Sequence, residues 1–292
     1  MFRRNTLVPM AAVARRDSPW YPRMVNVHPM IGLRFALRRG SWSFLALAFA
    51  APLLGCSDPQ GGTDVGNAAT VDFDVKAYEQ LPTQKAQSLT LGDGARVDGL
   101  WMVIDRVRLV PGASCDEGSD SQHVDIPGPL VADLVAGGLV TGPVAFPVNK
   151  GAFCKLKVGL HKLGGGESPA GAPADLAGLS ILMKGARLDG VAFTVRADLS
   201  EDLDLSATQG SFDLPAGRSP LFLAYEIGSW MTALELDQLP GPGPLVVDKQ
   251  NNADSLDAFQ EAVKSSARLF KDQNDDGDLS ETEHGDGEEL AD

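Results

Sequence analysis

Residues 69–237 carry the pattern that most constrains the fold: their apolar residues alternate with polar ones or come in short runs. Glycine and proline, 32 and 19 residues in the whole chain, separate these runs. Successive side chains of a β-strand point to opposite faces, so alternation is typical of a half-buried strand, and the 3–4 spacing of a helix is scarce here. The pattern predicts a mainly β protein, an antiparallel β-sandwich over residues 69–238.

Eight strands are expected in this domain. They are residues 71–77, 99–109, 144–148, 152–160, 180–183, 191–197, 203–207 and 221–227. A short helix is expected at residues 129–135, because the apolar residues there do not fit strict alternation.

The first 55 residues differ from the rest of the chain and predict a signal peptide. Arginines at positions 34, 38 and 39 precede an apolar run of about 11 residues, and small residues end it. A helix that spans a bilayer needs roughly 20 apolar residues, so this run predicts an export signal. Residues 1–29 precede an ordinary signal peptide, and we expect the true start at Met24 or Met30.

The end of this segment, Leu53-Leu54-Gly55-Cys56, resembles the lipobox of bacterial lipoproteins. The resemblance implies that Cys56 receives a diacylglyceryl group, that a peptidase cleaves after Gly55 and that the new N-terminus is acylated. Ser57 follows the cysteine, which by resemblance to enterobacterial sorting implies the outer membrane. Residues 56–68 then form a flexible tether. The alternative is a secreted protein in which Cys56 occurs by chance.

The charge of the chain excludes one class of partner. Its formal net charge is −14, and the first 55 residues hold eight of its 25 basic residues but only one of its 39 acidic residues. The remainder therefore carries about −21. Such a surface repels nucleic acid and anionic lipid headgroups and attracts divalent cations. We expect no nucleic-acid partner.

Two cysteines remain beyond the export signal, Cys115 and Cys154. An even pair in a protein bound for an oxidising compartment predicts a disulfide between them. The alternative is two buried thiols.

Four phrases of the central domain resemble an uncharacterised family of bacterial envelope lipoprotein domains with a transthyretin-like β-sandwich topology. They are LWMVIDRVRL (100–109), GPLVADL (128–134), GAFCKLKV (151–158) and MKGARLDGVAF (183–193). The resemblance spans about 170 residues and rests on strand patterns. It implies the fold and carries no catalytic signature.

The C-terminal part begins with a Pro/Gly-rich hinge at residues 239–253. A helix is expected from Asp254, a good N-cap, with Asp257 three residues on as in a capping box. Its apolar face is expected to pack on the sandwich. That face would contain Leu256, Phe259, Val263, Ala267 and Phe270.

Residues 272–283, DQNDDGDLSETE, match the calcium-binding loop of an EF-hand at its diagnostic positions. Ca²⁺ takes six to eight oxygen ligands, which such a loop supplies from positions 1, 3, 5, 7, 9 and 12. The resemblance implies side-chain ligation by Asp272, Asn274 and Asp276, ligation by the Asp278 carbonyl, a water-mediated contact from Ser280 and bidentate ligation by Glu283. Gly277 would form the sharp turn, and Leu279 the apolar plug.

The frame of this loop departs from the EF-hand pattern. Lys271 precedes it where an aromatic residue is usual, and Gly285 and Gly287 oppose an exiting helix. A single loop with a helix on one side only predicts weak calcium affinity, with a dissociation constant near the 10⁻⁴–10⁻³ M of extracellular modules. It also predicts a structural site that locks the C-terminal tail to the preceding helix. The alternative is an acidic tail without a bound ion.

The motifs of catalysis are missing from the sequence, which contains no His-Glu-x-x-His helix and no Gly-x-Ser-x-Gly elbow. His123, His161 and His284 read as surface residues. We therefore expect a non-enzymatic, calcium-binding envelope lipoprotein, with a protein or glycan as its partner. The alternatives are an adhesion or assembly subunit that uses a sheet edge and a calcium-dependent hydrolase that uses carboxylates such as Asp198 and Asp204.

Overall fold

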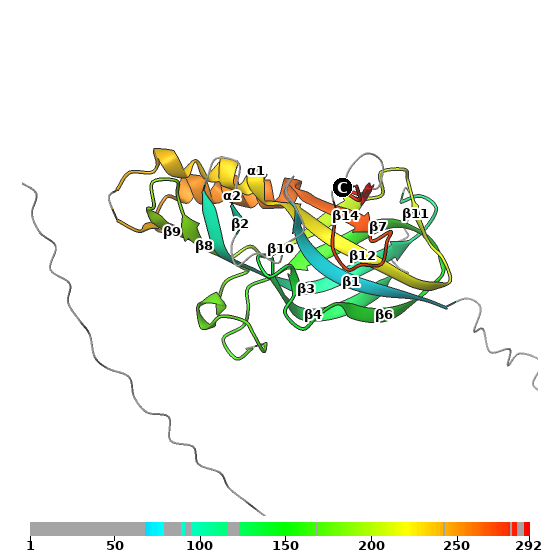
Figure 1. Cartoon of the computed structure of the whole chain (residues 1–292). Helices are drawn as coiled ribbons and strands as arrows, with labels where there is room; N and C mark the ends of the chain where they lie inside the picture. The colour runs from blue at the N-terminus through cyan, green and yellow to red at the C-terminus, as the bar shows by residue number, and fades with distance from the viewer. Residues whose placement is uncertain are drawn as a thin grey trace, which may run out of the picture. The chain divides into compact units, whose positions relative to one another are not determined.

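The computed structural model describes residues 68–78, 89–90, 95–115, 123–167, 169–241, 243–280, 282–284 and 289–292. The expected signal peptide, Cys56 and nearly all of the tether lie outside these ranges. The described residues belong to one compact unit, Pro59–Asp292. This unit is mainly β, as the alternating pattern predicts, and its strands form two sheets (Figure 1).

The smaller sheet, sheet A, contains the residues that position the candidate site. Its strands in spatial order are β15 (Glu289–Ala291), β14 (Ala267–Lys271), β12 (Gly217–Glu226), β1 (Ala68–Tyr78) and β6 (Val144–Asn149). β1 is antiparallel to β6 but parallel to β12 along its whole length. The expected β-sandwich is therefore present and mostly antiparallel, with β1 and β12 as a parallel pair.

The larger sheet, sheet B, is built around β3, which pairs along different parts of its length with several strands. Its main path is β10 (Glu201–Ser206), β7 (Gly151–Leu160), β3 (Arg96–Pro111), β8 (Ile181–Ala186), β9 (Ala192–Ala197) and β13 (Leu245–Val247). Four shorter or branching strands complete it: β2 (Leu89–Thr90), β4 (Val124–Asp133), β5 (Gly138–Leu139) and β11 (Phe212–Leu214). β13 lies within the expected hinge and pairs in parallel with β9.

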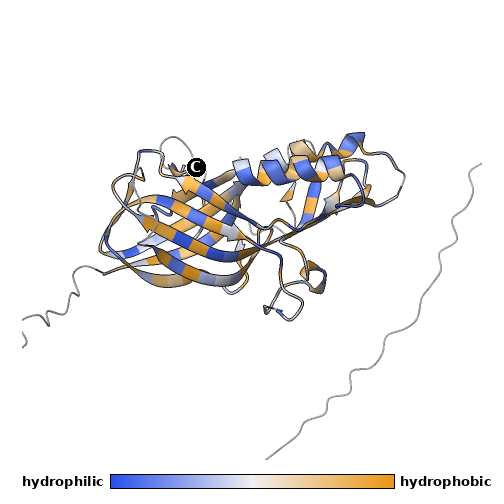
Figure 2. Cartoon of the chain, turned by 180° about the vertical axis from the view of Figure 1, so that it is seen from behind, coloured by the Kyte–Doolittle hydropathy of each residue, from blue (hydrophilic) through white to orange (hydrophobic). Residues whose placement is uncertain are grey.

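The two sheets share one apolar core. Alternate residues of β1 and β12 in sheet A, and of β3 and β7 in sheet B, are buried in the same cluster. They include Val71, Phe73, Val75, Leu221, Leu223, Tyr225, Val107, Leu109, Leu156 and Val158. The strands show the matching bands of hydrophilic and hydrophobic residues (Figure 2). A sandwich therefore forms because each sheet buries one face against the other.

All eight expected strands are present with shifted ends, whereas the expected helix at residues 129–135 is wrong. Those residues continue β4 and its turn, and β4 pairs with β3. The register between β3 and β4 shifts between Ile104 and Arg106, so a bulge changes the phase of burial. Val131 packs in a small apolar cluster separate from the central core, and Ala132 packs in the central core. Both residues are therefore buried, so polar and apolar residues do not alternate here.

Two helices pack on each other and on the core (Figure 1). α1 (Ile227–Leu234) follows β12 directly, where the sequence predicts only the end of a strand. Trp230 of α1 lies edge-on to Phe259 of α2, with ring centroids 5.6 Å apart, and its indole Nε1 donates a 2.6 Å hydrogen bond to Ser266 Oγ. Two short 3₁₀ turns, Ala174–Leu176 and Leu236–Gln238, complete the helical structure described.

The C-terminal helix, α2 (Ala253–Ser265), begins and ends differently from the sequence-based expectation. Its N-cap is Asn252, in the left-handed conformation, and not Asp254. It ends at Ser265, so Ala267 and Phe270 belong to β14, where they pair with Tyr225 and Phe222 of β12. Pairing with an available strand outweighs the helical period of these apolar residues.

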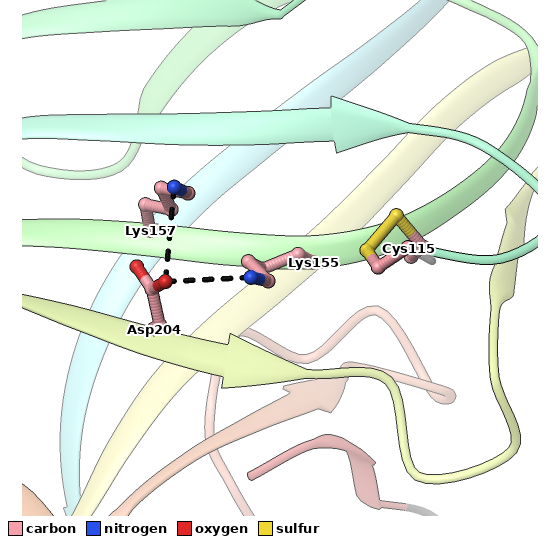
Figure 3. Close-up of a disulfide and its surroundings, with 5 residues drawn as sticks. Cys115, Lys155, Lys157 and Asp204 are labelled. Carbon is pink, nitrogen blue, oxygen red and sulfur yellow. Dashed lines mark hydrogen bonds and ion pairs between the residues drawn. A yellow bond between two sulfur atoms is a disulfide. The ribbon is translucent and has the colours of Figure 1, made fainter. Parts of the chain in front are cut away.

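The predicted disulfide between Cys115 and Cys154 is present. It ties the segment that follows β3 to the buried position 154 of β7. Close to it, Asp204 of β10 lies between Lys155 and Lys157, at 3.3 and 3.7 Å from their Nζ atoms (Figure 3). Among the described residues we find no helix with the length and apolarity that crossing a membrane requires.

Replacing both Cys115 and Cys154 by alanine is expected to destabilise the protein. The two residues are 39 positions apart, and the chain-entropy model gives about 4 kcal/mol for closing a loop of that size. Urea unfolding followed by fluorescence measures the loss, and reducing the wild-type protein should reproduce it. Equal unfolding midpoints for the variant and the oxidised wild type would contradict this prediction.

Candidate metal centre

The candidate site is the loop between β14 and β15, and a strand rather than a helix leads into it. The amide of Asp272, the first residue after β14, donates a 3.2 Å hydrogen bond to the carbonyl of Pro220 on β12. The site is thus attached at its first residue to sheet A. The expected connection of a tail to a helix is therefore wrong: the loop joins two strands of the same sheet.

The loop crosses the outer face of sheet A (Figure 1). A small apolar cluster of Phe222, Ala224 and Phe270 lies on that face, and Leu279 of the loop packs against it. At the far end of the loop, the ring of His284 stacks on Tyr78 of β1, with centroids 5.4 Å apart. Leu279 therefore serves as the apolar plug that the sequence predicts.

Hydrogen bonds within the loop give it the compact path of a ligand cage. The carbonyl oxygen of the Asn274 side chain accepts from the amide of Asp276, and the Asp276 carboxylate accepts from the amide of Asp278, at 2.9 and 2.8 Å. Gly277 has φ +80°, a conformation that side chains with a Cβ rarely adopt. Its amide donates a 2.9 Å hydrogen bond to Asp272 Oδ2.

Three carboxylates converge in this loop. Oxygen atoms of Asp272, Asp276 and Glu283 all lie within 4.8 Å of one another. Asp272 and Glu283 are each only 3 % exposed, while Asp276 is exposed. Three negative charges this close repel one another unless a cation or protons compensate them.

The two buried carboxylates are satisfied to different degrees. Glu283 accepts hydrogen bonds on both oxygens, from the Gln273 amide at 2.9 Å and from the Ser280 amide and hydroxyl at 2.8 Å each. Burial raises the pKa of Glu283, but these hydrogen bonds lower it more, so the net shift is downward. Glu283 is therefore held as a carboxylate.

Asp272 is the less satisfied member of the pair. Its Oδ1 is buried and accepts no hydrogen bond. Burial, followed by the charges of Glu283 and Asp276, raises its pKa above the ordinary value, against the lowering effect of hydrogen bonds from Gly277 and Asp275. Buried polar groups usually have a hydrogen-bond partner; among the described residues, Ser219 Oγ and Tyr225 Oη are the other buried side-chain atoms without one.

Arg218 interacts electrostatically with the loop, but its side chain is paired with another carboxylate. The guanidinium of Arg218 hydrogen-bonds the Asp72 carboxylate, which is the first cause of its raised pKa, and the charges of Asp275 and Asp272 contribute less. The side chain of Arg218 is 72 % exposed. Arg218 is therefore engaged by Asp72, and it makes no hydrogen bond to Asp272 Oδ1.

The structure brings together most of the residues that the sequence assigns to the site. Asp272, Asp276 and Glu283 form the cluster, Asn274 Nδ2 lies 3.0 Å from Asp276 Oδ2, and Ser280 binds Glu283. The donors are carboxylates, an amide and a hydroxyl, all with oxygen, which fits a hard divalent cation. The sequence did not indicate Pro220, Tyr78 or the Phe222 cluster, because only the fold brings them to the loop.

The carboxylates considered for hydrolysis have other neighbours. Asp198 Oδ2 lies 2.8 Å from Lys249 Nζ, and Asp204 is shared by two lysines of β7. Of the histidines, His123 lies 3.3 Å from an Asp125 carboxylate oxygen, and His161 Nδ1 lies 2.9 Å from Ser200 Oγ.

Asp272→Asn is expected to stabilise the protein when all divalent metal is chelated. The amide oxygen keeps the bond from Gly277, and the amide nitrogen replaces an unpartnered acceptor with a donor in a cluster that contains two other carboxylates. We expect the free energy of unfolding to rise by about 1 kcal/mol. Urea denaturation in EDTA measures it, with Asp278→Asn, an exposed change in the same loop, as a control that should be neutral. A loss of stability in Asp272→Asn would show that Asp272 Oδ1 has a partner already.

Comparisons with known proteins give no match: no family model, no curated protein and no solved structure matches the chain. What the protein does is therefore inferred from its own residues.

Proposed function

We propose that the protein is a calcium-binding, lipid-anchored envelope protein without enzymatic activity, in which the ion holds the C-terminal segment on the β-sandwich. The observation that carries the proposal is the buried, unpartnered Oδ1 of Asp272, which belongs to a cluster with Asp276 and Glu283. Among the described residues, the three carboxylates form no ion pair with a basic side chain, so a divalent cation would neutralise their charge.

The choice of calcium rests on the number and kind of oxygen donors. The loop offers the side chains of Asp272, Asn274, Asp276 and Glu283 and the carbonyl of Asp278, with Ser280 next to Glu283. Ca²⁺ accepts many oxygens in a flexible shell, while Mg²⁺ demands octahedral geometry and keeps several waters. Gln273, Asp275 and Leu279 are not assigned to the ion.

A structural role suits the frame of the site better than a signalling role. An EF-hand sensor responds to calcium by changing the angle between two helices. Here the entering element is β14, which pairs with β12 along its length. A strand fixed in a sheet has no comparable freedom to swing.

The alternative of an adhesion or assembly subunit requires an open sheet edge. Among the described strands, the outer strands of sheet A are the three-residue β15 and β6, which contains Pro147. Short strands and proline are the usual protection of an edge against pairing. The calcium-binding proposal is therefore preferred.

Calcium is expected to stabilise the full chain by a small, saturable amount. At ten times a dissociation constant near 10⁻⁴–10⁻³ M, the gain is about 1.4 kcal/mol, or roughly 3 to 5 °C in Tm for a domain of this size. Scanning calorimetry across a calcium titration measures it, with magnesium as a second titrant that should have a smaller effect.

Glu283→Gln should abolish this calcium-dependent shift, because it removes the bidentate charge that closes the cage. Glu261→Gln, an exposed carboxylate on α2, is the matched control and should retain the full shift. The proposal fails if the two variants respond to calcium alike.

The anchor is tested separately through Cys56, which lies outside the described residues. Replacing it by alanine should release the protein from bacterial membranes, because several acyl chains, each methylene contributing about 0.8 kcal/mol, hold the wild type there. Detergent phase partition and intact mass report the change, and Ser57→Ala should remain lipidated. Membrane retention of Cys56→Ala would rule out this anchor.

A further inference from the structure

β15, the last strand of the chain, is bound to both sheets. On one side it pairs with β14 of sheet A, with Ala291 opposite Leu269. On the other side it contacts the end of β10 in sheet B, through a bridge between Ala291 and Ala207. Ala291 is completely buried in the central core. Residues 289–292 thus connect the two sheets at this edge, while elsewhere the Leu139 amide of β5 donates a 2.7 Å hydrogen bond to the Asp74 carboxylate of β1.

We call the contact between residues 206–208 and 289–292 the seam. Ser206 and Asp292 exchange backbone hydrogen bonds of 2.7 and 3.1 Å, and the Thr208 amide donates to the Leu290 carbonyl at 3.0 Å. The Thr208 hydroxyl adds a 2.9 Å hydrogen bond to the Glu289 carbonyl. Within the described residues, the three amide-to-carbonyl bonds of the seam are the backbone–backbone hydrogen bonds that join sheet A to sheet B.

A segment this short cannot hold itself in place. β15 has three residues, and the register of its pairing with β14 shifts between Leu269 and Phe270. A strand of three residues opens readily, because few hydrogen bonds oppose the conformational entropy that it gains on opening. Docking of β15 therefore depends on how well the preceding residues fix its starting point.

The candidate metal centre supplies that fixed point. Asp272 is attached to β12, Glu283 binds the amide of Gln273 at the start of the loop, and His284 stacks on Tyr78 five residues before β15 begins. An ion shared by Asp272 and Glu283 would hold both ends of the loop together. Without it, the repulsion between their carboxylates opposes the closed form.

We propose that cation binding by residues 272–283 acts as a latch that docks residues 289–292 into the seam and so joins the two sheets. This inference rests on the proposed function, since it requires that the loop bind calcium. Without calcium the loop loosens, residues 289–292 leave the seam, and the edges of β14 and β10 lose their shared partner.

Hydrogen exchange of the full chain tests the latch directly. The amides of Ser206, Thr208 and Asp292 donate across the seam, so their exchange should be at least about tenfold slower in calcium than in EDTA. Amides of the central strands β3 and β12 should exchange equally slowly in both. Glu283→Gln should show fast seam exchange with or without calcium, while Glu261→Gln should behave as wild type.

Reciprocity gives an independent test, because two coupled equilibria must affect each other by the same factor. Deletion of residues 289–292 leaves every assigned ligand intact and should weaken calcium binding about fivefold or more, measured by calorimetric titration. Thr208→Val removes the hydroxyl that donates to the Glu289 and Leu290 carbonyls and should weaken calcium binding about twofold. The point substitution keeps the test valid if the deletion does not fold.

The outcomes separate the latch from the calcium site. Calcium binding with unchanged seam exchange, and with full affinity in Thr208→Val, would overturn the latch and leave the proposed function standing. A wild-type chain that binds no calcium would overturn both. Calcium-dependent seam protection together with weakened binding in Thr208→Val supports the latch.

Discussion

The parallel pairing of β1 with β12 is the interaction on which the rest of the structure depends. It runs from Ala69 opposite Gly217 to Tyr78 opposite Glu226, and the chain between the two strands contains almost all of sheet B. Parallel strands require such a crossover, and here the crossover is most of the domain. The two paired strands are therefore far apart in the sequence, which contributes to the high proportion of long-range contacts in the fold.

The position of β12 decides where the acidic loop can lie. Its inner face supplies Leu221 and Leu223 to the common core, and its outer face supplies Phe222 to the cluster beneath Leu279. The carbonyl of Pro220 holds the amide of Asp272. The loop is rich in acidic residues, which favour exposure to water. It nevertheless lies against a sheet, and two of its carboxylates are buried there.

Local patterns could predict the strands and the site residues, because both are written in short stretches of sequence. Alternation identified the eight strands, and the 12-residue spacing identified Asp272, Asp276 and Glu283 as neighbours. The sequence could not predict the end of α2, because Phe270 continues the helical stripe as well as it fits a strand. That choice is made by β12, whose free side offers pairing to residues 267–271. The sequence did not predict β15, because three residues are too few to show a periodic pattern. They form a strand because they lie between the two sheets.

The strand frame changes what an ion in this loop can do. In a helix–loop–helix unit, ligation by the last glutamate pulls one helix relative to another, and the response is an angle. Here the loop begins at a strand fixed by β12 and ends shortly before a strand too short to be fixed by its own hydrogen bonds. The two buried carboxylates also differ in their hydrogen bonds. Glu283 accepts hydrogen bonds on both oxygens, whereas Asp272, which directly follows β14, has one oxygen that accepts none. Under the proposed latch, ligation in this frame acts on the order of residues 289–292, and through them on the hydrogen bonds of the seam.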